Sequence, residues 1–179
     1  MIRLVNFTGG FVKYFAYGSN MSILRLQERV PSALRIGVFL LEGHQLRFHK
    51  ASKDGSGKCD AHQTNDKDDV VIGALFEIDQ SEKKHLDSAE GLGYDYDEKV
   101  VTVKNHSGES FEVLIYCAIN TGSSLKPYSW YLNHVVTGAN EIKVPAQYLD
   151  IIQSTECIED PNKNRDTRQR AIYSALKYQ

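Results

Sequence analysis

The chain has 179 residues, 41% of them hydrophobic and 25% charged, which suits a single domain with its own core. Its net charge of −2 gives no electrostatic basis for binding nucleic acid. It contains no run of about 18 apolar residues, so we expect no membrane-spanning helix. The N-terminal stretch MIRLVNFTGGFVKYF lacks the pattern of a secretory signal, which predicts a cytoplasmic protein.

The three cysteines, Cys59, Cys117 and Cys157, are far apart and odd in number. A disulfide framework is therefore not expected, and reduced thiols fit a cytosolic protein. Cys117 lies in the apolar run VLIYCA, which favours a place in the core over a role as nucleophile.

The first half of the chain has mainly the pattern of strands. The predicted elements are strands at 12–17, 34–41, 44–49 and 70–78, a helix at 22–30, and a polar loop at 50–69 with a short strand near 60–63. Pro31 ends the helix. The second and third strands are joined tightly around Glu42-Gly43, as in a hairpin.

The second half alternates between helices and a hairpin. The predicted elements are helices at 79–90, 127–137 and 145–153, and paired strands at 98–104 and 110–118. Asp79 and Glu82 have the spacing of a capping box at the first helix, and Gly91 follows it as a stop signal. Pro127 would begin the second helix and Gly138 would close it.

The tail at 154–179 is polar at first. An apolar stripe of Ala171, Ile172, Ala175 and Leu176 then predicts that its last turns dock as a helix. Strands outnumber helices, and several are neighbours along the chain. This favours the α+β class, with a mixed or antiparallel sheet or a small barrel, and we take 1–179 as a single domain.

Two stretches resemble ligand-binding loops without matching them. DGSGKC lacks a P-loop's first glycine, because that place is Ser52, and it has Cys59 where Ser or Thr would hold Mg²⁺. DKDDVVIG has the carboxylates of an EF-hand, but Val71 stands where that loop needs glycine. The histidines and cysteines show no metal-ligand spacing, so no metal site is predicted.

The stretch YFAYGSNM, Tyr14 to Met21, leads from the first strand into a helix. Ser19 fails the pattern of a nucleophile elbow, because Tyr17 and Met21 stand where glycines are required. Gly18 would let a ligand approach the backbone, and Asn20 or Ser22 could cap the helix. Free N–H groups at this helix start would form a small-anion site; the alternative is a plain strand–turn–helix corner.

Glu90 is predicted at the last turn of a helix, just before Gly91. The negative end of the helix dipole and partial burial would both raise the pKa of its carboxyl. Such a glutamate can act first as a general base and then as an acid. The alternative is an ordinary surface glutamate. Asp87, on nearly the same helix face, is a candidate second acid or a support for the following loop.

Five segments together resemble the γ-glutamylcyclotransferase (AIG2-like) family. They are YFAYGSNM, LDSAEG, the stretch 96–103 that follows it, LIYCA and PYSWYLNHVVTGA, in the family's order across most of the chain. The resemblance implies a small mixed β-barrel with helices around it. It also implies an intramolecular reaction without metal or cofactor, in which the α-amine of a γ-glutamyl group attacks its own γ-carbonyl and releases 5-oxoproline and a free amine or amino acid.

The resemblance assigns the catalytic carboxylate to one residue, Glu90. It places the substrate-binding groups on the turn and two later tyrosines: Tyr14, Phe15, Ala16, Tyr17, Gly18, Ser19, Asn20, Tyr116 and Tyr131. The turn would hold the substrate's α-carboxylate, and Glu90 would take a proton from its ammonium, which is not nucleophilic while protonated.

The leaving group stays open at this point. A γ-glutamyl amino acid or peptide, a γ-glutamylamine and another γ-glutamyl compound all fit the same chemistry. The acidic segment GYDYDE indicates a bias against acidic leaving groups. A non-catalytic binding module is the alternative of another class, although Glu90 argues against it. The partner implied is a small molecule rather than nucleic acid or membrane, and dimers in the family allow a homodimer.

Overall fold

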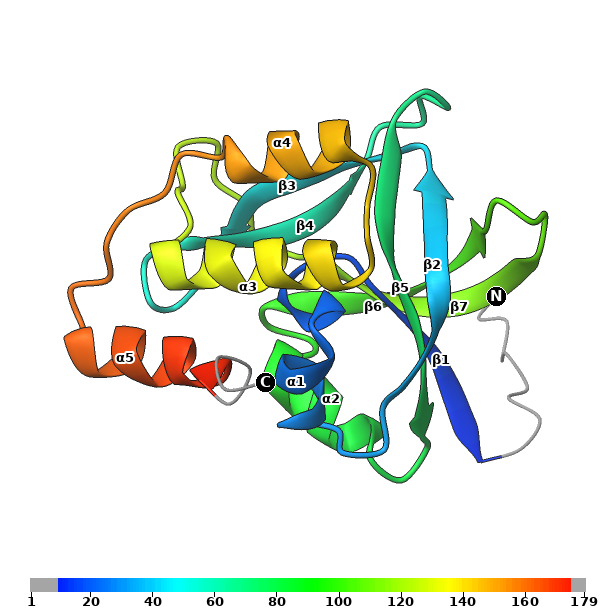
Figure 1. Ribbon diagram of the computed structural model, residues 1–179, viewed down its shortest axis with the longest axis horizontal. Helices are drawn as coiled ribbons and strands as arrows, with labels where there is room; N and C mark the ends of the chain where they lie inside the picture. Colours follow the sequence, from blue (N-terminus) through cyan, green and yellow to red (C-terminus); the bar gives the residue numbers. More distant parts are fainter. Residues whose placement is uncertain (1–9, 175–179) are drawn as a thin grey trace.

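A closed five-stranded barrel forms the centre of the computed structural model, which describes residues 10–174 (Figure 1). The strands follow the order β1 (Phe11–Ala16), β5 (Val70–Asp79), β2 (Leu34–Glu42), β6 (Tyr96–Lys104) and β7 (Ser110–Ala118). Neighbours pair antiparallel except β1 and β7, which close the barrel in parallel. The α+β class, the mixed barrel and the hairpin of β6 and β7 are thus confirmed.

A second sheet of two strands lies beside the barrel. It pairs β3 (His44–Ala51) with β4 (Gly57–Gln63). The expected hairpin of the strands on either side of Gly43 is therefore wrong, and the loop predicted at 50–69 contains a strand longer than expected. Gly43, at φ 73°, turns the chain out of the barrel, and its N–H donates to the Asp69 carbonyl at 2.8 Å.

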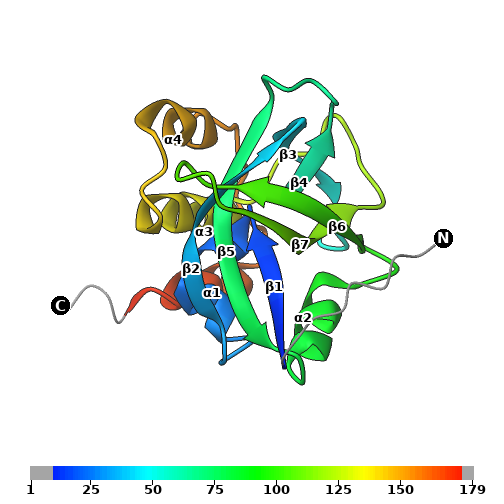
Figure 2. The same ribbon diagram turned by 90° about the vertical axis from the view of Figure 1, so that its right-hand side faces the viewer.

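Six helical segments of the described chain pack outside the barrel. They are the 3₁₀ turn η1 (Ser19–Met21), α1 (Ile23–Gln27), α2 (Lys83–Glu90), α3 (Ser129–Glu141), α4 (Ala146–Gln153) and α5 (Lys163–Ala171). Figures 1 and 2 show α3 and α4 together on one side of the barrel, with α1 and α2 near one end. Within residues 10–174, no helix has the length and apolar character needed to cross a membrane.

Close packing inside the barrel depends on Gly73 in β5. A Cβ at this position would lie 2.4 Å from the Ala16 carbonyl oxygen and 2.7 Å from the Phe15 ring. Phe15 and Phe76 are fully buried in the same core. Burying such a side chain contributes about 1.5–3 kcal/mol, so the aromatic and apolar runs of β1 and β5 hold the barrel together.

The start of α1 differs from the prediction. The helix is shorter than expected, and Ser22 occupies the N-cap without a capping hydrogen bond from its side chain. The Glu141 carboxylate instead accepts from the Ile23 N–H at 3.0 Å and from the Ser22 hydroxyl at 2.9 Å. The start of α1 is therefore satisfied by a carboxylate of the protein itself, so it does not provide the expected anion site.

The capping box predicted for α2 is also wrong, because the helix begins at Lys83. Asp79 instead accepts from the Ser81 N–H at 2.8 Å in the preceding turn. The end of the helix is as predicted: Gly91 adopts the left-handed conformation at φ 67° and accepts no side chain without strain. This turn fixes Glu90 as the last residue of α2.

Helix α3 begins at Ser129 and continues past Gly138, which was predicted to close it. A Cβ at Gly138 would lie 2.6 Å from both the Met21 Cβ and the Ser22 N. Gly138 is therefore a contact glycine, which lets α3 pack directly on η1. The helix predicted at 145–153 is confirmed as α4.

The tail contains a helix, α5, which ends where the predicted apolar stripe begins. Helix α5 has no buried residue, and Ala175 and Leu176 lie outside the described residues. Arg165 makes a bidentate ion pair with buried Asp160, in which Nε lies 2.6 Å from Oδ2 and Nη2 lies 2.7 Å from Oδ1. Tyr173 is buried against α3. Up to residue 174, the ion pair of Arg165 and the buried ring of Tyr173 attach this segment to the rest of the protein.

Candidate active site

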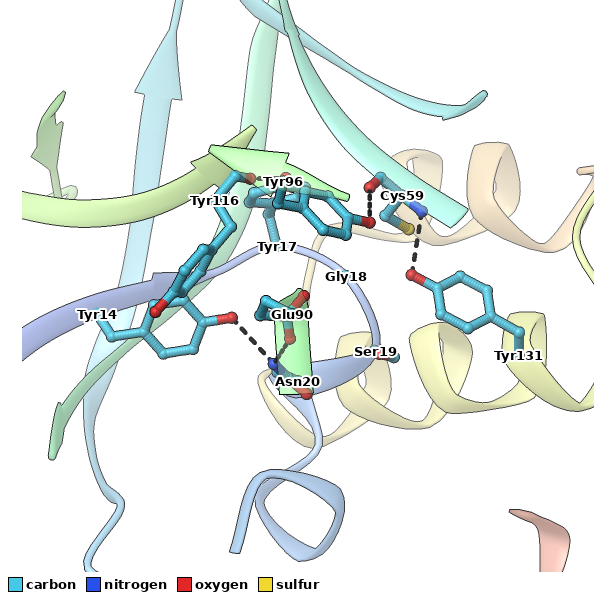
Figure 3. A pocket seen from close by; sticks show the side chains of 10 residues that line it. All are labelled: Tyr14, Tyr17, Gly18, Ser19, Asn20, Cys59, Glu90, Tyr96, Tyr116 and Tyr131. Carbon is cyan, nitrogen blue, oxygen red and sulfur yellow. Dashed lines mark hydrogen bonds between the residues drawn. The ribbon is translucent and has the colours of Figure 1, made fainter. Parts of the chain in front are cut away.

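One pocket lies where the end of β1, strand β4, helix α2 and helix α3 meet (Figure 3). Its lining is mostly aromatic and polar: Tyr14, Tyr17, Gly18, Ser19, Asn20, Cys59, Glu90, Tyr96, Tyr116 and Tyr131. Glu90 lies centrally in Figure 3, with Tyr14 and Tyr116 to one side and Tyr131 to the other. Segments far apart in the sequence thus supply one concave site with a single carboxylate at its centre.

Most of the predicted site residues gather in this pocket, including the turn, Glu90 and both later tyrosines. Phe15 and Ala16 do not line it. Side chains alternate along a strand, and Phe15 packs into the core over Gly73. Ala16 offers only a buried methyl group. The binding role expected of these two side chains is therefore not supported by the geometry.

Gly18 is required by close packing rather than by its backbone angles, since its φ is −119°. A Cβ there would lie 2.8 Å from the Cys59 Cβ and 3.4 Å from the Tyr131 hydroxyl oxygen. The N–H of Met21 bonds back to the Gly18 carbonyl at 3.0 Å. Within the described part of the chain, the N–H groups of Ser19 and Asn20 bond to no protein acceptor, so the turn offers two backbone donors to a ligand.

Glu90 is held through one carboxylate oxygen. Its side chain is 14% exposed, and Oε1 accepts from Asn20 Nδ2 at 2.8 Å and from Arg29 Nη1 at 3.0 Å. Both donors stabilise the ionised carboxylate. The contact with Arg29, which is 61 residues from Glu90 in the sequence, was not predicted. No hydrogen bond to Oε2 is found among residues 10–174, which leaves that oxygen for a substrate proton.

The five pocket tyrosines differ in what their hydroxyls do. Tyr17 donates to the Tyr116 carbonyl, Tyr96 donates to the Cys59 carbonyl at 2.7 Å, and Tyr116 donates to Asp87 at 2.5 Å. Asp87 therefore orients Tyr116, which was not predicted; it was expected to be a second acid or a support for the following loop.

Tyr14 and Tyr131 accept hydrogen bonds instead. Tyr14 accepts from Asn20 Nδ2 at 3.1 Å, and Tyr131 accepts from the Cys59 N–H at 3.0 Å. Burial raises the pKa of both phenols well above the usual range, and the charge of Glu90 adds to the effect. Both hydroxyls therefore keep their protons at neutral pH and can donate them to a substrate oxygen.

Neither Ser19 nor Cys59 is equipped as a nucleophile. No hydrogen bond from the Ser19 hydroxyl to a base is found in the described chain. Burial raises the pKa of the Cys59 thiol to about 12, so the reactive thiolate is scarce at neutral pH. Glu90 is then the group of the pocket best placed to move a proton.

A second cavity of about 150 Å³ shares Ser19, Glu90, Tyr96 and Tyr131 with the first. Four cations line it, Arg25, Arg29, Lys50 and Lys58, together with the carboxylates of Glu90 and Asp95. The Arg25 Nε is buried and has no partner among the described residues. We call this cavity the basic mouth; it carries a surplus of positive charge in a protein of net charge −2.

Tyr96, Cys59 and the four cations were not predicted as site residues. Tyr96 lies just after Glu90 in a motif segment, which is a usable signal. Arg25 lies on α1, and Arg29 lies in the turn that follows this helix. Lys50 and Lys58 come from β3 and β4. Nothing in the local sequence distinguishes these two lysines from surface residues of a polar loop.

The comparisons with known proteins agree on one family. A family model described as "AIG2-like family" matches residues 70–152. A protein named γ-glutamylcyclotransferase from Bos taurus is 30% identical over 148 residues, which cover 80% of this chain and 78% of that protein. A protein of the same name from Homo sapiens is 29% identical over the same length.

Solved structures show the same fold. A crystal structure described as an uncharacterized protein from Homo sapiens superposes with a TM-score of 0.77 at 27% identity, covering 84% of this chain and 90% of that one. A structure named γ-glutamyl cyclotransferase superposes with a TM-score of 0.78 at 24% identity, covering 88% and 99%. By sequence and by fold, the chain belongs to the γ-glutamylcyclotransferase family.

Proposed function

We propose that this chain converts a γ-glutamyl compound to 5-oxoproline and a free amine, with Glu90 as the base. The observation that carries the proposal is the geometry of that carboxylate. Glu90 lines the pocket, Oε1 is fixed by Asn20 and Arg29, and Oε2 accepts no hydrogen bond from the described chain. The names of the relatives support the same reaction.

The reaction needs one proton carrier and no other reactant. Glu90 takes a proton from the substrate's α-ammonium, and the amine nitrogen attacks the γ-carbonyl carbon to form the ring C–N bond. Glu90 then returns that proton to the leaving nitrogen as the old C–N bond breaks. The ring nitrogen also loses its second proton, which is transferred to the released amine, so the products are the lactam and an ammonium. Ring closure joins two groups of one molecule, so the pocket's main tasks are orientation and charge stabilisation.

The turn and the tyrosines supply donors for these tasks. The N–H groups of Ser19 and Asn20 are suited to the substrate's α-carboxylate. The hydroxyls of Tyr14 and Tyr131 can donate to the oxygen that becomes negative as the γ-carbonyl is attacked. Buried, preorganised donors of this kind need little reorganisation during the reaction.

The basic mouth favours a leaving group that carries a carboxylate. The acidic segment GYDYDE predicted the opposite bias, but its Asp95 is paired with Lys50 at 2.8 Å. Arg25, which has an unpartnered Nε and no carboxylate partner among the described residues, adds positive charge beside Glu90, whereas Lys58 is paired with Asp54 at 3.0 Å. Among the alternatives, a γ-glutamyl amino acid or peptide therefore fits better than a γ-glutamylamine.

Release of 5-oxoproline tests the proposal. We expect turnover of γ-glutamyl-alanine, and at least tenfold lower kcat/KM for the same compound with its C-terminal carboxylate converted to an amide. Equal rates would remove the leaving-group preference but keep the reaction. Ligand binding without 5-oxoproline release from any γ-glutamyl compound would instead support the non-catalytic binding module. Cytoplasmic location and a homodimer stay predictions of the sequence.

A further inference from the structure

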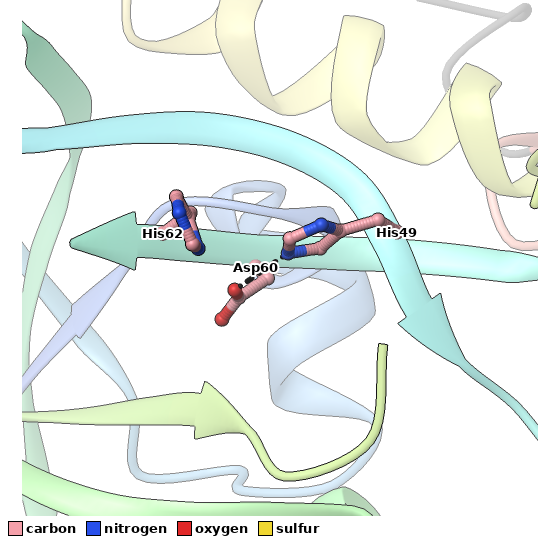
Figure 4. A group of neighbouring side chains, drawn as sticks. All are labelled: His49, Asp60 and His62. Atoms are coloured by element: carbon pink, nitrogen blue, oxygen red, sulfur yellow. Dashed lines mark hydrogen bonds and ion pairs between the residues drawn. The ribbon is translucent and has the colours of Figure 1, made fainter. Parts of the chain in front are cut away.

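Three side chains suited to hold a metal ion meet on the small sheet, outside the pocket (Figure 4). His49 comes from β3, and Asp60 and His62 come from β4. One ligand atom from each lies within 4.8 Å of the other two. Asp60 and His62 are two residues apart on one strand and so point to the same face, whereas Cys59 points to the other face, into the pocket.

These residues have no metal-ligand spacing along the chain because they come from two strands. The pairing of β3 with β4 shifts register between Arg47 and Lys50, next to His49. In the structure, the His49 and His62 rings pack edge to face with centroids 5.3 Å apart. Only strand pairing brings these two imidazoles to the same carboxylate.

Asp60 is already oriented as a metal ligand would be. Its Oδ1 accepts from the Ala118 N–H at 2.8 Å, and its Oδ2 lies 2.9 Å from His49 Nε2. The side chain is 7% exposed. A backbone donor on one carboxylate oxygen that leaves the second for the ion is the usual support of a ligating carboxylate.

An ion pair between His49 and Asp60 that ties the strands together would explain two of the three residues. It does not explain His62, whose ring makes no hydrogen bond within residues 10–174 and yet lies against the same pair. His62 is half-buried, so the group can be reached from solvent.

The distances are close to those of an occupied site. Zinc bonds of 2.0–2.1 Å in a tetrahedron place ligand atoms about 3.3 Å apart. The three ligand atoms lie within 4.8 Å of one another, so they must approach by about 1.5 Å at most. A rotation of the half-buried His62 side chain can supply this movement.

We propose that His49, Asp60 and His62 bind one divalent transition-metal ion, with water completing the coordination. Two imidazoles and one carboxylate suit Zn²⁺, and also Co²⁺ as a spectroscopic substitute. The ion would link β3 to β4 and, through Asp60, to β7. Because Cys59 precedes Asp60, an occupied site would also stiffen the strand that forms one wall of the pocket.

The test uses full-length protein without an affinity tag, treated with a chelator and then dialysed. Titration with Co²⁺ should give visible d–d absorption that saturates at one equivalent, without the near-ultraviolet band of a cobalt–thiolate bond, which would indicate cysteine ligands. Zn²⁺ should displace the cobalt and raise Tm. The proposal would be overturned if the absorption did not saturate at a defined ratio of Co²⁺ to protein, or if a cobalt–thiolate band appeared.

Three variants locate the ion. His62→Ala and Asp60→Asn should each weaken binding at least tenfold and abolish the rise in Tm with Zn²⁺. His106→Ala, which removes an exposed histidine from the turn between β6 and β7, should bind as the wild type does. The His62 ring makes no hydrogen bond within residues 10–174, so we expect His62→Ala to fold. This variant therefore keeps the test valid if Asp60→Asn folds poorly. Unchanged affinity in His62→Ala would refute the site, whatever the enzymatic activity.

Discussion

The amide nitrogen of Asn20 lies 2.8 Å from Oε1 of Glu90, which joins the turn after β1 to the last residue of α2. The same nitrogen lies 3.1 Å from the Tyr14 hydroxyl. Arg29 donates through Nη1 to both Glu90 Oε1 and Asn20 Oδ1, each at 3.0 Å. The carboxylate is thus held on one side, and the turn proposed to bind the substrate also positions the proposed base.

Replacing Glu90 by Gln should abolish 5-oxoproline release while the fold is kept. The amide has nearly the same shape but cannot accept and return the proton, and a lost acid–base group costs about 10²–10⁴ in rate. The measurement is kcat for γ-glutamyl-alanine, with circular dichroism to check folding. The control is Glu112→Gln, because Glu112 is exposed on β7. A kcat for Glu90→Gln within threefold of the wild type would refute the mechanism.

Adding one methyl group at Gly18 should impair both stability and substrate binding. The new Cβ would lie 2.8 Å from the Cys59 Cβ, so the turn or β4 must move, at a cost of about 1–3 kcal/mol in the free energy of unfolding. KM should rise because the movement would displace the free N–H groups of Ser19 and Asn20, which follow Gly18 in the chain. Gly37→Ala is the matched control, since its Cβ would meet the Phe39 ring at an ordinary 3.5 Å. Equal KM values in the two variants would remove the turn from the site.

Tyr131→Phe should lose activity and stability together. The buried Cys59 N–H would lose its acceptor, which costs about 1–3 kcal/mol, and the pocket would lose a hydroxyl donor. Tyr148→Phe makes a matched comparison, because the Tyr148 hydroxyl accepts from the buried Ile72 N–H at 3.1 Å outside the pocket. Urea unfolding should show similar losses for both variants, whereas kcat/KM should fall only for Tyr131→Phe. A parallel fall in both would mean that Tyr131 acts through stability alone.

Buried His134 should make the protein less stable in acid. Burial, and then the charge of Arg25, lowers the pKa of its imidazole to about 3. Between pH 6.5 and 3 the unfolded chain binds a proton there that the folded chain does not, so stability falls as the pH falls. The slope from one such proton is at most about 1.4 kcal/mol per pH unit.

Urea unfolding from pH 7 to 4 measures this effect. His134→Gln should be less stable than the wild type at pH 7, because contacts with Gln169 and Tyr173 change, but should lose less stability on acidification. His106→Gln, altered at an exposed turn, should follow the wild-type curve. Identical slopes for wild type and His134→Gln would show that His134 is not the titrating group.

Local patterns in the sequence predicted most of the elements. The aromatic run before Gly18, the apolar run at 70–78 and the alternating pair around 105–109 each fold as their period indicates, because side-chain alternation is a property of neighbouring residues. Gly91 ends α2 as predicted because a left-handed residue is a local requirement.

The failures involve contacts over long distances. Gly138, the predicted end of a helix, lies inside α3, where its missing side chain admits Met21. Glu141, rather than Asn20 or Ser22, caps α1. The strand pairing of β3 also differs, since β3 leaves the barrel to pair with β4. In each case the deciding contact comes from a residue remote in the sequence, which a local pattern does not indicate.

The sequence by itself determined the order of most strands and helices, the turn at Gly18 and the place of Glu90 at a helix end. Only the tertiary structure brought Arg29 and Asn20 to one oxygen of Glu90, gathered Lys50 and Lys58 at its mouth, and set His49 beside Asp60 and His62. Backbone propensity and side-chain period act over a few residues, whereas charge, hydrogen bonding and ligation depend on distances in space that barrel closure and strand pairing set.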